Sequence, residues 1–175
     1  MPLVPNAPEE GGGKRRTLLE ILIMLLIVGL VGTFAAVAVN AARSRARDAT
    51  RLSAVSQAQS ALEQYFGSAN GYPPGSGLPL GDSAQAACLG TGGFKADCSG
   101  DADVFLRIVR GTLDTGLKGL VACGTPLRNA FCYTQLKGGD AYAIQFELEN
   151  ALPEAGLAKG INCAAPDGMK AGACQ

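Results

Sequence analysis

The sequence predicts an α+β fold in which one long N-terminal helix packs on a small antiparallel β-sheet with disulfide-closed loops. Three observations predict it. An apolar run over residues 18–39 continues without a proline into an amphipathic stretch that ends near residue 66. The remaining chain contains most of the 24 glycines, an alternating strand and all six cysteines. We therefore expect a head at 1–16, a transmembrane helix half at 17–39, an amphipathic half at 40–66 and a globular domain at 67–175.

The head cannot form a packed element. Its first residues, MPLVPNAPEEGGG, contain three prolines and three adjacent glycines. We expect a disordered leader here.

The apolar run is long enough to cross a bilayer. Its 22 residues, Leu18 to Val39, make a helix of about 33 Å. The run is longer than the apolar core of a cleavable secretory signal, although that alternative stays open. Besides Thr33, its one polar residue is Glu20, and an acid within a membrane span is a functional hypothesis by default. A local ion pair of Glu20 with Arg16, four residues earlier, is the simpler alternative.

The amphipathic half carries a narrow apolar stripe. Apolar positions recur at three- and four-residue steps, which is typical of a helix lying against a domain on one side: Leu52, Val55, Ala58 or Gln59, Leu62 and Phe66. The opposite, solvent-facing side is expected to carry Arg43, Arg47, Arg51, Ser53 and Gln57. The helix should stop within the GSANGYPPGSG segment at 67–77, because Asn-Gly and Pro-Pro cannot continue it.

The globular domain contains recognisable strands. Residues 141–149 alternate apolar and polar side chains and predict a half-buried strand. Residues 130–136 form a second candidate, joined to the first by the hairpin loop KGGD, and 120–124 a third. Apolar residues on one face predict a short helix at 101–113. The tail from residue 162 is expected to be irregular.

The cysteines favour disulfides in an oxidising compartment. No CxxC pair and no histidine are present, so metal ligation is the weaker alternative, as are unpaired thiols. Six cysteines allow about 15 pairings. Because Gly- or Pro-containing loops can turn their ends together, we favour the local set: Cys88–Cys98, Cys123–Cys132 and Cys163–Cys174. This compartment places the globular domain outside the cell membrane and the head in the cytoplasm.

Other signals for chemistry are weak. Asp97, Asp101 and Asp103 crowd one loop and are a weak Ca²⁺ candidate, but solvated loop charge with an aspartate helix cap is favoured. GTGG at 90–93 has no strand–turn–helix context and is interpreted as a turn. Without histidine, the usual catalytic triads lack their base, so we expect no enzyme and no cofactor. A net charge of zero gives no nucleic-acid signal.

The N-terminal third resembles type IV pilins and pseudopilins. TLLEILIMLLIVGL is similar to the opening of that family, and NAARSRARDATRLSAVSQAQSALEQYF followed by NGYPP is similar to its amphipathic half and exit turn. YAIQFELE with a Gly- and Cys-containing tail resembles the C-terminal part of many small bacterial pilins. The resemblance covers the first helix well and the globular domain only in style.

The resemblance implies a pilin-like fold and a structural role. The chain would be a subunit of a type IV pilus-like or pseudopilus filament, anchored in the cell membrane before assembly, with residues 17–39 in the filament core. Glu20 would meet the terminal amine of a neighbouring subunit. The implied partners are further copies in a helical filament, other pilins, an assembly platform with its ATPase, and a prepilin peptidase.

The processing region departs from the family pattern. Where the family has Gly and usually Phe before Thr17, this chain has Arg15 and Arg16, and the nearest glycine is Gly13. Cleavage after Gly13, cleavage at an atypical site and no cleavage all stay open. The alternative function is therefore an uncleaved single-span surface protein whose outer domain binds a ligand without polymerising.

Overall fold

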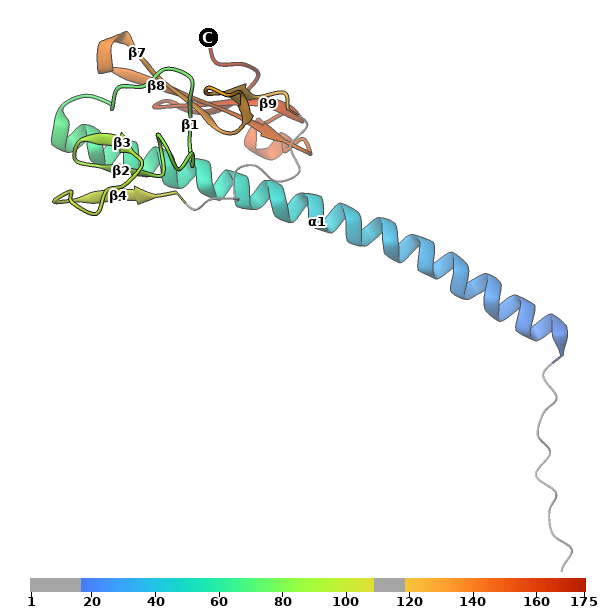
Figure 1. The fold of residues 1–175 in the computed structure, drawn as a ribbon. Coiled ribbons are helices and arrows are strands. Elements are labelled where there is room, and N and C mark those ends of the chain that lie inside the picture. The colour runs from blue at the N-terminus through green and yellow to red at the C-terminus, as the bar shows by residue number, and fades with distance from the viewer. Residues whose placement is uncertain (1–16, 109–118) are drawn as a thin grey trace, which may run out of the picture. The chain divides into compact units, whose positions relative to one another are not determined.

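The computed structural model describes residues 17–108 and 119–175. Figure 1 shows one long helix followed by short strands. The chain divides into two units, the first ending at Ala41 and the second running from Ala42 to Gln175. The boundary falls inside the helix, close to the predicted change from its apolar to its amphipathic half.

The helix α1 spans Leu18–Ala69, which confirms the long helix predicted from the apolar and amphipathic stretches. It is rich in leucine and alanine and contains no proline, so every turn keeps its backbone hydrogen bonds. It ends where Asn70 adopts a left-handed conformation (φ 54°) and donates its N–H to the carbonyl of Phe66 at 2.8 Å.

The main sheet has five antiparallel strands in the order β1-β7-β8-β9-β10. The predicted strands at 130–136 and 141–149 are confirmed as β7 and β8, which pair through Tyr133 and Ile144 and are joined by the 3-10 turn η1. The bounds are β1 Leu78–Pro79, β7 Cys132–Leu136, η1 Lys137–Gly139, β8 Ala141–Leu148, β9 Gly160–Ala165 and β10 Gly168–Ala171.

The tail is not irregular as the sequence predicted. β9 and β10 form a hairpin in which Met169 pairs with Ala164, and the turn between them uses Gly168 at a φ of 121°. A further 3-10 turn, η2 at Pro153–Ala155, lies in the β8–β9 connection. Pairing with β8 organises this segment, since its own sequence alternates only weakly.

A second sheet has the order β3-β2-β4, with β2 Cys88–Gly90, β3 Gly93–Lys95 and β4 Val104–Arg107. The GTGG stretch forms the turn between β2 and β3, as predicted. The predicted helix at 101–113 is wrong where the structure describes it, because residues 104–107 pair as a strand with β2. Residues 109–113 lie outside the described residues. The predicted strand at 120–124 is shorter, β5 Ala122–Cys123, and pairs with β6 Arg128–Asn129.

The main core lies between the second half of α1 and the five-stranded sheet (Figure 1). Val55 and Leu62 of α1 are fully buried against Ile144 and Phe146 of β8. Full burial of such a side chain contributes about 1.5–3 kcal/mol. The stripe predicted on the amphipathic half therefore faces the sheet, with Leu52 and Phe66 at its partly buried edges.

The other face of β8 is also covered, which the sequence did not predict. A half-buried strand at 141–149 would leave Ala143 and Glu147 on its solvent face, but both are buried. A small cluster around the Cys123–Cys132 disulfide lies in this part of the domain. The Glu147 carboxylate accepts a hydrogen bond from the Leu120 N–H at 3.1 Å, so this buried acid has a hydrogen-bond partner.

All six cysteines are paired in the predicted local set. The Cα–Cα distances are 6.1 Å for Cys88–Cys98, 5.8 Å for Cys123–Cys132 and 5.1 Å for Cys163–Cys174. Each bond closes a loop of about ten residues and contributes roughly 3 kcal/mol in the chain-entropy model.

Candidate functional site

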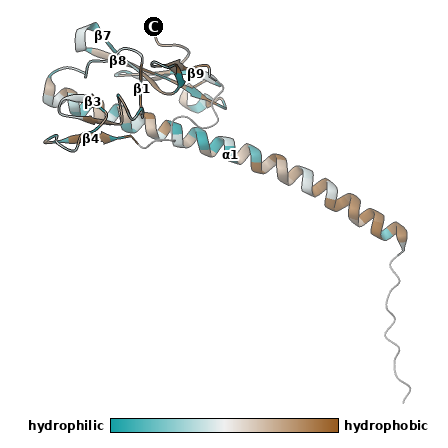
Figure 2. Ribbon diagram, viewed as in Figure 1, coloured by the Kyte–Doolittle hydropathy of each residue, from teal (hydrophilic) through white to brown (hydrophobic). Residues whose placement is uncertain are grey.

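The first half of α1 is an uncovered apolar surface. Figure 2 shows it as mostly hydrophobic, whereas hydrophilic and hydrophobic residues alternate along the second half. From Leu18 to Val39 every residue is exposed, including Leu18 at 87% and Phe34 at 69%. The helix is long and apolar enough to cross a membrane. A surface of this size needs lipid or another protein to cover it.

Glu20 lies in the first turn of this apolar half. Its N–H donates to the carbonyl of Thr17 at 2.9 Å, and Thr17 is the residue that precedes the helix. A carboxylate here is favoured by the N-terminal end of the helix dipole. Within residues 17–108 and 119–175, Glu20 forms no ion pair. Its predicted local partner Arg16, and the processing residues Gly13 and Arg15, lie outside the described residues.

A network of charged and polar side chains connects the second half of α1 to the residues that directly follow β8; we call it the polar latch. Its members are Ser44, Arg47, Asp48, Arg51, Glu149 and Asn150. All of them belong to the unit that begins at Ala42. The polar latch therefore lies within the globular unit. In the sequence of α1 it comes after the apolar half and just before the apolar stripe that begins at Leu52.

Asp48 is the acceptor at the centre of the polar latch. One carboxylate oxygen accepts the Arg51 guanidinium and the Glu149 N–H, at 2.8 and 2.9 Å. The other accepts the Asn150 N–H and its side-chain amide, both at 2.8 Å. Asp48 is only 1% exposed, so these four bonds replace the water that the carboxylate would otherwise bind.

Glu149 joins both arginines of the polar latch. Arg47 contacts it with two guanidinium nitrogens at 2.8 and 2.6 Å, and Arg51 contacts one oxygen at 2.8 Å. The bidentate hydrogen bond from Arg47 is the main reason that the pKa of Glu149 falls to about 2. The carboxylate is thus ionised at neutral pH and compensates the charge of Arg51, which is buried.

The polar latch corrects the sequence interpretation of this face. Arg51 was expected on the solvent side, but it is 2% exposed and binds Glu149. Arg47 is exposed as predicted, with 43% of its side chain accessible, although it also binds Glu149. A signal was present: Ser44, Arg47, Asp48 and Arg51 have the i, i+3, i+4, i+7 spacing of one helix face, and Val55 continues it. Charged residues are rarely buried unless paired, so this spacing places the four side chains on one face but does not by itself predict that the face is buried.

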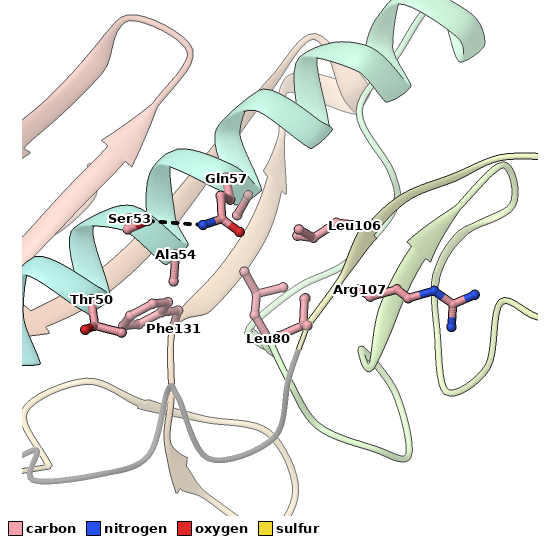
Figure 3. A pocket seen from close by; sticks show the side chains of 10 residues that line it. Thr50, Ser53, Ala54, Gln57, Leu80, Leu106, Arg107 and Phe131 are labelled. Carbon is pink, nitrogen blue, oxygen red and sulfur yellow. Dashed lines mark hydrogen bonds between the residues drawn. The ribbon is translucent and has the colours of Figure 1, made fainter.

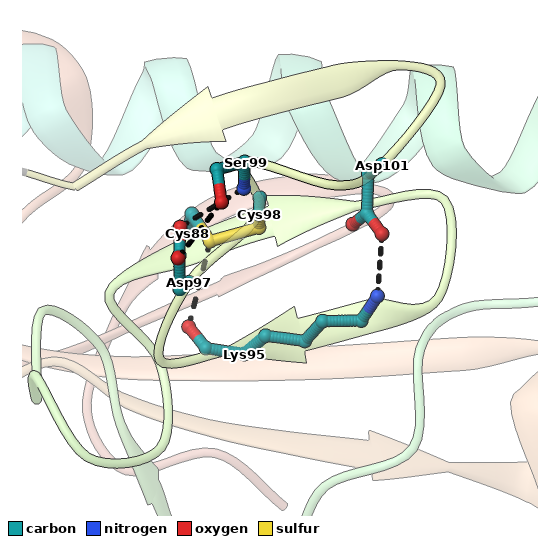
Figure 4. Close-up of a disulfide and its surroundings, with 6 residues drawn as sticks. All are labelled: Cys88, Lys95, Asp97, Cys98, Ser99 and Asp101. Atoms are coloured by element: carbon teal, nitrogen blue, oxygen red, sulfur yellow. Dashed lines mark hydrogen bonds and ion pairs between the residues drawn. A yellow bond between two sulfur atoms is a disulfide. The ribbon is translucent and has the colours of Figure 1, made fainter.

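The aspartates of the 97–103 loop do not converge. Asp97 accepts the Ser99 N–H and hydroxyl at 2.9 and 2.8 Å, whereas Asp101 binds Lys95 at 2.5 Å (Figure 4). The hydrogen bonds from Ser99 lower the pKa of Asp97. No group of three acidic, cysteine or histidine side chains suited to a metal occurs in the part of the chain that the structure describes. Asp97 therefore organises a turn, and the predicted helix cap is not formed because a strand follows.

A groove of about 300 Å³ lies between the second half of α1 and β4 (Figure 3). Ala54, Leu80 and Phe131 give it an apolar lining, and Gln57 donates to the Ser53 hydroxyl at 3.1 Å along its edge. These groups fit an apolar side chain better than a polar substrate.

Comparison with known families, curated proteins and solved structures finds no match to this chain.

Proposed function

We propose that the chain is a structural subunit of a type IV pilus-like or pseudopilus filament that assembles through its N-terminal helix. The observation that carries the proposal is α1 itself. One helix of 52 residues joins an apolar half with no cover to a half that is buried against the sheet and held by the polar latch. This is the division that a filament subunit needs, because the apolar halves can pack together while the globular units remain in water.

Before assembly, the apolar half would anchor the subunit in the cell membrane. We infer that the head lies in the cytoplasm and the globular domain outside, since three disulfides require an oxidising compartment. Export from the membrane into an extracellular filament would use an assembly platform and a prepilin peptidase, with other copies and other pilins as filament partners. The role is mechanical and not enzymatic.

Glu20 is the residue that we assign to assembly. In a bundle of apolar helices, its carboxylate would need a cation, and the terminal amine of a neighbouring copy would supply one. Such a pair would fix the axial register between copies, because a displaced copy would leave both charges unpaired in an apolar environment.

The test compares fibres sheared from cells that carry working assembly machinery. We expect Glu20→Ala to reduce fibre yield at least tenfold, because a loss of about 1.4 kcal/mol already changes an equilibrium tenfold. The globular domain should keep its three disulfides and its resistance to protease. Glu154→Ala, which removes an exposed acid from η2, is the matched control. A normal fibre yield from Glu20→Ala would contradict the assembly role.

Arg15 and Arg16 favour one alternative, an uncleaved single-span surface protein. They stand where the resembled family has residues suited to peptidase cleavage. N-terminal sequencing of the membrane-extracted protein distinguishes the two functions: a start near residues 14–17 supports the filament subunit, and a start at Met1 supports the alternative. Met1 found in purified fibres would instead show assembly without cleavage.

A further inference from the structure

On one face of α1 near residue 47, the side chains belong to the polar latch. Ser44, Arg47, Asp48 and Arg51 lie on this face, and each makes a hydrogen bond or ion pair to the network. Their spacing of three and four residues brings them into one row that continues toward the buried Val55.

Arg43 and Arg45 lie off that face. At about 100° per residue, they fall roughly 90–110° to either side of its centre. Both are exposed, and neither forms an ion pair within residues 17–108 and 119–175. Asp48 and Glu149 balance the charges of Arg47 and Arg51, so Arg43 and Arg45 leave a net charge of +2 on the outer flanks of the helix.

The two arginines follow the apolar run at a distance that suits lipid phosphate. Arg43 and Arg45 lie four and six residues beyond Val39, or about 6 and 9 Å along the helix. The headgroup layer on each side of a bilayer is about 5–8 Å thick. Arg43 starts within this layer and Arg45 just beyond its outer edge, and long arginine side chains at both positions reach phosphate oxygens, which the planar guanidinium binds with two parallel hydrogen bonds.

We propose that Arg43 and Arg45 form a binding surface for anionic lipid headgroups on the side of the membrane that carries the globular domain. The proposal rests on the membrane anchoring inferred above. Lipid phosphate accounts for a pair of exposed cations on opposite flanks of the helix, since lipid surrounds a single span on all sides. A carboxylate partner on a second copy would need only the flank that faces that copy.

The test uses the full chain in vesicles, before any assembly. The protein has no tryptophan, so Val39→Trp places a single fluorophore at the end of the apolar run, where tryptophan is favoured in membranes. Its quenching is compared in phosphatidylcholine vesicles that contain phosphatidylglycerol, with bromine on the acyl chains of one lipid or the other. The ratio gives the relative association constant of the two lipids.

We expect the reporter protein to prefer phosphatidylglycerol about fivefold at low salt, the selectivity that one arginine near an anionic surface supplies. Arg43→Gln with Arg45→Gln should lower the ratio to near 1, and high salt should do the same. The matched control neutralises Lys137 and Lys170, two exposed lysines of the sheet region, and should keep the preference.

An unchanged ratio in the arginine variant overturns the proposal, and so does a reporter protein without any preference. Loss of fibres in that variant with an unchanged ratio also overturns it, and assigns the arginines to contacts between copies. Absence of quenching by either brominated lipid would refute membrane anchoring itself, so failure of the proposed function and failure of this inference give different results.

Discussion

Asp48→Ala is the sharpest test of the polar latch. The substitution removes the acceptor of four hydrogen bonds at 2.8–2.9 Å, two of them from the backbone N–H groups of Glu149 and Asn150. Asp48 is 1% exposed and Arg51 is 2% exposed, so bulk water does not replace these bonds without opening the structure. The turn that follows β8 would lose its attachment to α1.

The expected loss is about 3–4 kcal/mol in the free energy of unfolding. Each orphaned N–H costs about 1–3 kcal/mol. Removing one partner of a buried ion pair costs about 3–5 kcal/mol when the other charge is left alone. Arg51 keeps its contact with Glu149, so only part of the cost of breaking a buried ion pair applies here. For a unit of this size, about 4 °C per kcal/mol gives a fall in Tm of roughly 12–16 °C.

The assay is thermal unfolding of the oxidised full chain in detergent, followed by near-ultraviolet circular dichroism of the tyrosines. Asp140→Ala removes an exposed acid and is the control, with a change expected within about 0.5 kcal/mol. Asp48→Asn keeps one acceptor oxygen and should lie between the two. If Asp48→Ala matches Asp140→Ala, the latch does not hold α1 to β8 in the way that the contacts imply.

Three further predictions concern the globular unit. Because the pKa of Glu149 is lowered to about 2, its ionised form stabilises the fold above about pH 4.5, and this contribution is lost as the pH falls toward 2; Glu149→Gln should lack that part of an acid unfolding curve. Burial raises the pKa of Tyr142 to about 12, so the folded chain holds this proton where the unfolded chain loses it, and stability should fall as the pH rises above 10 while absorbance at 295 nm lags behind the unfolded control. Replacing Cys123 and Cys132 together by serine should lower the free energy of unfolding in urea by about 3 kcal/mol. If reducing the two bonds that remain in this variant lowers it by only the same amount, the three bonds do not act independently.

The helix and the disulfides could be predicted because their causes are local. The start of α1 follows from the apolar run, and its end follows from the turn residues after Phe66, which stop a helix in any protein. The disulfide pairing follows from loops of about ten residues that bring their ends together at low entropic cost. No distant residue has to be known for either prediction.

The strand β4 and the polar latch depend on partners that are distant in the sequence. Val104 and Ile108 fit a helix face as well as a strand, and only the pairing of Leu106 with Leu89 decides between them. Arg47 binds Glu149, which follows it by 102 positions. The spacing in α1 shows that these polar residues share one face, but it could not show that the face is buried or that the acid comes from Glu149, directly after β8.

The position of the polar latch along α1 gives a physical reason for burying charges there. Apolar residues at positions 44, 47, 48 and 51 would pack against β8 without the desolvation cost of ions. On that face they would also extend the apolar surface of the helix from Val39 to Val55, and only the exposed Arg43 and Arg45 would then mark the end of the membrane span. With ionic residues, the same face is held to the globular unit by directional bonds, and the run still ends at Val39. The charged residues therefore hold α1 to the globular unit and also end the apolar surface of the helix. Purely apolar packing would do only the first.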